Sequence, residues 1–74
     1  MFTQTTAPTA ADVSAHLRLL YLERALADLE HLTADAGYMA DLAAEIAATR
    51  SAYVGAAVTE LATLRGELSG RPQG

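Results

Sequence analysis

The 74-residue chain contains no cysteine, no tryptophan and no lysine. The lack of cysteine excludes disulfide scaffolds, thiol chemistry and cysteine-ligated zinc sites. The five basic residues are all arginines scattered along the chain, whereas nine residues are acidic, which gives a net charge of −4. Phosphate backbones and anionic membrane surfaces are bound by clustered Lys and Arg side chains. The sequence therefore predicts no direct binding to nucleic acids and no membrane association.

Long apolar runs are also missing. No stretch reaches the roughly 18 consecutive apolar residues that a membrane-spanning helix requires. Residues 1–8 are rich in threonine and lack the basic and apolar regions of a signal peptide. From these absences we expect a cytoplasmic protein, with residues 1–8 as a disordered polar leader and residues 70–74 as a disordered tail.

The remaining sequence is typical of α-helix. Alanine, leucine, glutamate and arginine predominate, and the first half of this region contains no glycine or proline. Thr9 is a favourable helix N-cap residue, with Asp12 three residues later near the positive end of the helix dipole. Gly37 interrupts the helical pattern directly after Asp35, which favours a turn. The elements expected within a single domain over residues 9–69 are a helix over 10–35, a turn at 36–37 and a second helix over 38–68.

The expected fold class is all-α, a two-helix antiparallel hairpin. The apolar spacing also continues through Gly37, so one long helix of about 60 residues in a coiled coil is the alternative. The hairpin is favoured because turn-forming residues gather at 35–37 and because so long a helix is uncommon.

Each helix carries an apolar stripe expected to form the contact within the hairpin. On the first helix the members alternate at steps of four and three: Ala15, Leu19, Leu22, Leu26, Leu29, Thr33 and Ala36. A second apolar group lies on another flank of this helix: Val13, Leu17, Leu20 and Tyr21. On the second helix the stripe contains Met39, Leu42, Ala43, Ile46, Tyr53, Ala57, Leu61, Leu64 and Leu68, with Val54 and Val58 beside it.

The large hydrophobic side chains cover more surface than one hairpin can bury. A turn at 36–37 leaves the second helix overhanging the first, and the second flank of the first helix stays uncovered at the same end. We therefore expect a homodimer in which two hairpins form a four-helix bundle, with a second protein as a possible further partner. The residues predicted for this interface are Val13, Leu17, Leu20, Tyr21, Arg50, Tyr53, Val58, Leu61, Leu64 and Leu68.

Two features of the second helix have alternative interpretations. Arg50 falls inside the apolar stripe, where it could form a register-setting ion pair with Glu23 on the opposite helix. Alternatively, its stem packs while its guanidinium reaches solvent. The reverse side of this helix carries small residues, which suit either a second docking surface or a solvated face of good helix formers: Ala44, Ala48, Ser51, Gly55, Thr59, Ala62 and Gly66.

Catalytic or metal-binding chemistry has little support in the sequence. Asp12 and His16 are four residues apart on one helix face, but the paired Glu-x-x-His motifs of di-iron bundles are absent. This face and His31 are interpreted as solvated surface, and no cofactor is expected. The acidic residues occupy polar faces, and no phosphate-binding loop or nucleophile motif occurs. The sequence predicts that the protein is not an enzyme.

The expected function is a small, non-enzymatic module for protein–protein interaction and oligomerisation, acting as an adaptor, an assembly factor or a small regulator. The alternative is an acidic, antitoxin-like accessory regulator that masks a basic or nucleic-acid-binding partner. A third hypothesis is an enzyme or metal site that forms only across a dimer interface.

Overall fold

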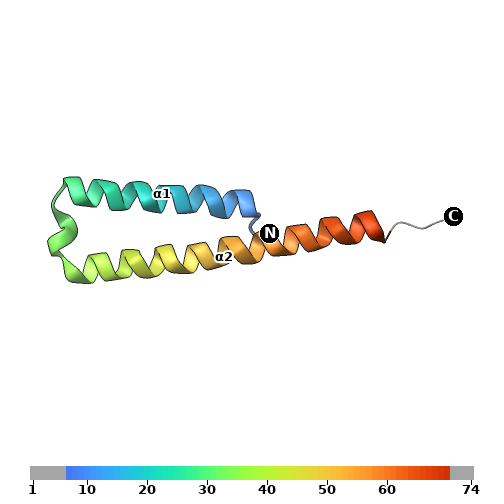
Figure 1. The fold of residues 1–74 in the computed structure, drawn as a ribbon. Coiled ribbons are helices and arrows are strands. Elements are labelled where there is room, and N and C mark those ends of the chain that lie inside the picture. Colours follow the sequence, from blue (N-terminus) through green and yellow to red (C-terminus); the bar gives the residue numbers. More distant parts are fainter. Residues whose placement is uncertain (1–6, 71–74) are drawn as a thin grey trace, which may run out of the picture.

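The computed structural model describes residues 7–70, which form an antiparallel helical hairpin (Figure 1). Helix α1 spans Ala10–Leu29, a short 3₁₀ turn η1 spans Leu32–Ala34, and helix α2 spans Ala36–Ser69. No strand occurs between residues 7 and 70. The predicted all-α hairpin is confirmed, and the alternative of one continuous helix is wrong. The predictions for the leader and the tail concern mainly residues 1–6 and 71–74, which lie outside the described part of the chain.

The beginning of α1 follows the sequence prediction. The hydroxyl of Thr9 accepts a hydrogen bond from the backbone N–H of Asp12 at 3.1 Å. The Asp12 carboxylate accepts in return from the backbone N–H of Thr9, which completes a capping box. These bonds satisfy backbone donors that would otherwise lack a partner at the first turn, and so they fix where α1 begins.

The connection between the helices lies earlier than the sequence predicts. α1 ends at Leu29 rather than near residue 35, because His31 adopts a left-handed backbone conformation, with φ 61°, that an α-helix cannot continue. Asp35 then caps α2, since its carboxylate accepts from the backbone N–H of Tyr38 at 3.0 Å. Gly37, the expected turn residue, instead lies in the first turn of α2.

The hydrophobic core lies between α1 and the first half of α2. Its centre consists of Leu20, Leu42 and Ile46, none of which is more than 5% exposed. Val13 and Ala27 are buried on the same side of α1. Four half-buried side chains pack around the centre: Leu17, Tyr21, Tyr38 and Met39.

The face that α1 presents to α2 differs from the prediction. The sequence assigned the hairpin contact to the stripe containing Leu19 and Leu22, but both side chains are more than half exposed. The hairpin is built on the other flank, where Ala27 is only 2% exposed. A small side chain at this position lets the two helices approach closely near the connection, which is a physical reason for the choice of face.

The register between the helices also differs from the expected one. Tyr38 donates its hydroxyl to the Glu23 carboxylate at 2.6 Å, and His16 lies 3.2 Å from the Glu45 carboxylate. Glu23 therefore pairs near the connection and not with Arg50, so of the two interpretations of Arg50 the structure contradicts the ion pair with Glu23. Arg50 is exposed and forms no ion pair with any residue between 7 and 70.

This register leaves much of α2 without a partner helix. Residues 58–69 continue α2 beyond the beginning of α1, and every one of them is exposed. The molecule is consequently elongated, with principal dimensions of 64 × 33 × 16 Å (Figure 1). We call residues 58–69 the α2 extension.

Candidate interaction surfaces

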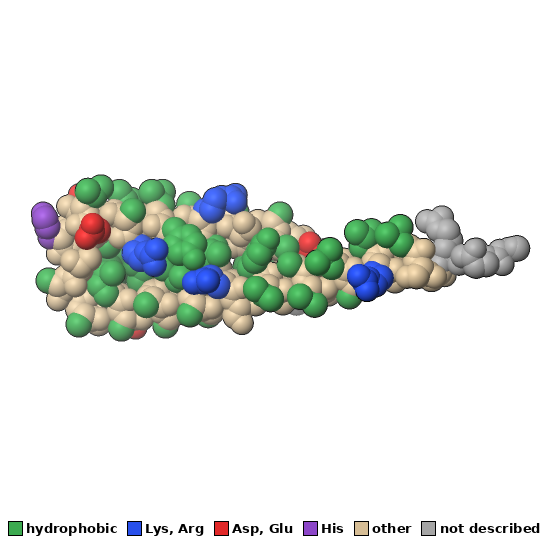
Figure 2. Space-filling view, viewed as in Figure 1, with side chains coloured by type: hydrophobic (Ala, Val, Ile, Leu, Met, Phe, Trp, Pro, Cys, Tyr) green, Lys and Arg blue, Asp and Glu red, His purple; other side chains and the backbone are tan. Residues whose placement is uncertain are grey.

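The α2 extension presents large apolar side chains to solvent. Leu61, Leu64 and Leu68 are 65%, 50% and 66% exposed, and Val58 is 58% exposed. Their spacing of three and four residues places them along one side of the helix. Figure 2 shows hydrophobic side chains gathered on this end of α2, beside a basic side chain. Surfaces of this kind on helices are typical sites for packing against another helix.

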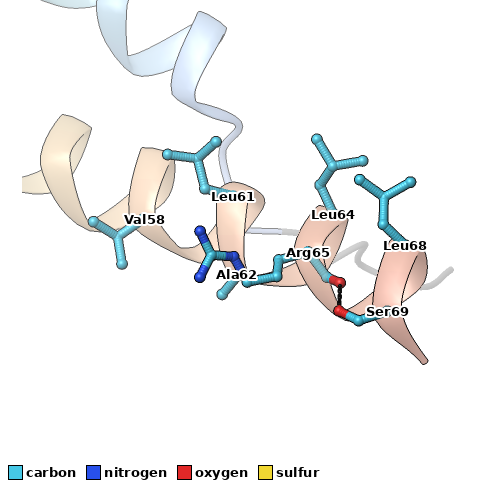
Figure 3. A pocket seen from close by; sticks show the side chains of 7 residues that line it. All are labelled: Val58, Leu61, Ala62, Leu64, Arg65, Leu68 and Ser69. Carbon is cyan, nitrogen blue, oxygen red and sulfur yellow. Dashed lines mark hydrogen bonds between the residues drawn. The ribbon is translucent and has the colours of Figure 1, made fainter.

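A shallow hollow lies along this part of α2. It measures about 600 Å³ and is bordered by Val58, Leu61, Ala62, Leu64, Arg65, Leu68 and Ser69. In Figure 3, Leu61, Leu64 and Leu68 project from one side of the helix, and the Arg65 side chain lies beside Ala62. The surface therefore combines an apolar ridge with one flanking positive charge.

A second apolar surface lies on α1 and η1. Leu19, Leu22, Leu26 and Leu29 recur at steps of three and four, and their exposed fractions range from 49% to 71%. Leu32 of η1 extends the set and is 47% exposed. The flank of α1 that contains Leu20 packs on α2, so these leucines face away from it. We call them the outer leucine stripe.

The ten residues predicted for the dimer interface fall into two groups. Four of them pack within the hairpin: Val13 and Leu20 are buried, and Leu17 and Tyr21 are half-buried against α2. The expectation that this flank lies off the contact between the helices is therefore wrong. The other six are exposed on α2: Arg50, Tyr53, Val58, Leu61, Leu64 and Leu68.

The outer leucine stripe was missed as a candidate surface because its regular spacing suggested the hairpin contact. The opposite flank contains Ala27, and a small residue facing a neighbouring helix favours close packing. Ala27 was thus the signal in the sequence that could have distinguished the two faces of α1.

The polar side chains of α1 form surface contacts. Asp12 caps α1, and His16 contacts Glu45 instead of forming a site with Asp12.

The pKa of Tyr38, at the beginning of α2, is raised above its ordinary value. The main cause is the hydrogen bond that its hydroxyl donates to the Glu23 carboxylate, with smaller effects of desolvation and of the Glu23 charge.

Residues 7–70 contain no cluster of metal-binding side chains and no membrane-spanning helix. Within this range no three His, Asp or Glu side chains come together in a group that could hold a metal ion. Neither α1 nor α2, as described, has the length and apolar character needed to cross a membrane.

The small-residue side of α2 is open to solvent. A Cβ atom added at Gly55 or Gly66 would meet no atom within 4 Å other than the adjoining backbone of α2. Neither glycine is therefore required for the contact between α1 and α2, and the hairpin does not use this face.

The chain matches no protein-family model, and no curated protein or solved structure resembles it at a significant level.

Proposed function

We propose that this protein is a small, non-enzymatic interaction module that forms a homodimer and acts as an adaptor, an assembly factor or a small regulator. The distribution of large hydrophobic side chains carries the proposal. Among the described residues, eleven such side chains are exposed, whereas the buried hydrophobic core has five members, one of them alanine. Exposed apolar surface of this extent on so small a protein marks a site for binding another macromolecule.

The geometry of the exposed side chains favours helical partners. Both the α2 extension and the outer leucine stripe repeat at steps of three and four residues, which is the spacing by which helices interlock side chains. A second hairpin supplies helices of the same kind and would complete a four-helix bundle.

An adaptor needs at least two binding surfaces. The α2 extension and the outer leucine stripe lie on different elements of the hairpin, and the large apolar side chains of both are exposed. One surface can therefore hold a second copy of the chain while the other remains accessible to a different protein.

The acidic side chains support a structural role over a catalytic one. Asp12 and Asp35 cap the two helices, and Glu23, Glu45 and Glu60 accept hydrogen bonds on the surface. All five residues are exposed. Acid–base catalysis instead depends on carboxylates whose pKa is shifted by burial or by a neighbouring charge.

The test is the molar mass in solution, measured by multi-angle light scattering and sedimentation equilibrium at increasing protein concentration. Mass must be measured directly because an elongated monomer elutes early from a sizing column. We expect the mass of two chains at micromolar concentration. The mass of one chain throughout, with the helical circular dichroism of a folded hairpin, would overturn the proposal.

A further inference from the structure

An exposed heptad pattern runs along the whole of α2, on a face next to the one that contacts α1. The contact with α1 uses Leu42, Ile46 and Thr49, which are buried. Beside them, positions separated alternately by four and three residues carry small side chains: Ala36, Ala40, Ala43 and Ala47. Beyond Arg50 the same pattern continues with Ala57 and with four larger side chains: Val54, Leu61, Leu64 and Leu68. We call this row the α2 seam, and all of it is exposed except the half-buried Ala57.

We propose that the α2 seam pairs in parallel with the α2 seam of a second copy, and that Glu60 of each chain pairs with Arg65 of the other. The inference rests on the proposed self-association and specifies which surface forms it and in which direction the helices run.

Charge complementarity fixes the parallel direction. Glu60 and Arg65 lie on opposite sides of the seam and are five residues apart, which is the separation at which flanking charges of two parallel helices meet. A two-fold axis along the helices creates this Glu–Arg contact twice. The same alignment brings Tyr53 against Val58 of the second copy, so that apolar side chains meet there.

The antiparallel direction has the opposite electrostatics. It brings side chains from the same flank of the two seams together, so that Glu60 faces Glu67 of the second copy. Two such contacts between like charges oppose antiparallel pairing.

Glu60 remains available for the parallel contact. One of its carboxylate oxygens accepts a hydrogen bond from the backbone N–H of Ala10 at 2.7 Å, and the second oxygen can accept from the Arg65 guanidinium of the second copy.

Arg50 interrupts the seam between its small and large halves. In the parallel dimer it meets Arg50 of the second copy, where the long stems pack and the guanidinium groups extend to solvent. A single charged layer in an otherwise apolar seam reduces stability but restricts the register.

The other candidate occupant of the α2 extension is the outer leucine stripe of a second copy. Its spacing fits when the two helices are antiparallel, and Arg18 would then lie opposite Glu67. This contact joins different surfaces head to tail without a two-fold axis, so it propagates into rings or filaments. The parallel seam instead closes as a dimer, which favours it.

The test exchanges the charges beside the seam. In Arg65→Glu, both interchain pairs become Glu–Glu, and we expect the dissociation constant to rise about tenfold. Glu60→Arg creates two Arg–Arg contacts and is expected to weaken the homodimer similarly. When the two variants are mixed, each copy regains an oppositely charged partner. Native mass spectrometry of an equimolar mixture should then show heterodimer well above one half of all dimers, the share that random pairing of equivalent chains gives.

Two controls separate the charge effect from folding. Arg18→Glu changes the sign of a charge on α1, away from the seam, and should leave the dissociation constant unchanged. The side chain of Arg65 makes no hydrogen bond or ion pair with residues 7–70 in the hairpin. Thermal unfolding of Arg65→Glu should therefore match that of the parent when both are monomeric, whereas Glu60→Arg loses the Ala10 contact as well.

The outcomes distinguish this inference from the proposed function. A parent protein that remains monomeric rejects both. A parent dimer that Arg65→Glu leaves intact rejects the parallel seam alone. A dimer strengthened by Glu60→Arg indicates antiparallel pairing, and an assembly broken by Arg18→Glu indicates the outer leucine stripe, so either result also overturns the inference.

Discussion

The two halves of α2 have similar helix-forming composition but differ in what covers them. In the first half, Leu42 and Ile46 are buried against α1. In the extension, Leu61 and Leu64 are at least half exposed, although the helix continues without a break. Tertiary packing therefore holds the first half, whereas the extension depends on intrinsic propensity and on continuing a helix already nucleated. An apolar helix of this kind is stabilised further only when a partner covers it.

The largest effect should come from removing a core side chain. Leu20→Ala leaves a cavity between α1 and α2 and is expected to lower the free energy of unfolding by about 2–4 kcal/mol, independently of protein concentration. Leu61→Ala is the matched control, because this leucine is 65% exposed within one chain. Its effect on the monomer should stay within about 0.5 kcal/mol. Urea denaturation at low and high protein concentration provides both measurements. If Leu20→Ala and Leu61→Ala lowered the free energy of unfolding of the monomer equally, the proposed difference between the two halves of α2 would be contradicted.

A charge on the extension should separate association from folding. Leu64→Glu places a carboxylate in the proposed interface, and we expect dimerisation to weaken by on the order of a hundredfold, or about 2.7 kcal/mol. The helical circular dichroism should persist, since Leu64 contributes little to the hairpin core. Sedimentation equilibrium measures the change. Unaltered dimerisation would show that the extension is not the interface.

The helical fold was predictable because local signals agree. The absence of glycine and proline from residues 10–35 and the N-cap at Thr9 mark α1, and Asp35 caps α2. The end of α1 was not predictable in the same way. It depends on His31 adopting a left-handed conformation, whereas the sequence draws attention to Gly37, the residue type that favours it.

The candidate site was predictable on α2 but not on α1. With the expected turn at 36–37, Leu68 already lies beyond the beginning of α1, so an overhang follows from helix lengths alone. The earlier connection in the structure adds Leu61 and Leu64 to this overhang. α1 instead carries two apolar stripes of comparable strength, and the spacing of their large side chains alone does not decide which stripe faces α2. That choice depends on interhelical packing around Ala27 and on the register set by the connection.

A smaller effect should appear on replacing a glycine within the extension. Gly66→Ala adds a methyl group that meets no atom within 4 Å outside the adjoining backbone of α2, so helix propensity alone decides the result. We expect the extension to gain about 0.5–1 kcal/mol of local stability, measured as slower amide hydrogen exchange over residues 58–69. Exchange of the amides in α1 should not change. A destabilised dimer would indicate that this small-residue face contacts a partner.

The smallest effect concerns the packed end of the hairpin, where Tyr38 donates to Glu23. The pKa of the tyrosine is raised in the folded chain, chiefly by this hydrogen bond, so folding favours the protonated phenol. Its contribution to stability is therefore complete below the pKa of an unfolded tyrosine, about 10, and is lost as the pH rises through the folded value. Ultraviolet absorbance titration, with Tyr38→Phe to assign the signal, should show Tyr38 ionising at lower pH in Glu23→Gln.

The contact between Tyr38 and Glu23 lies far from the extension. Dimerisation of Glu23→Gln should therefore match that of the parent at neutral pH, and a changed dissociation constant would mean that the two halves of the molecule are coupled.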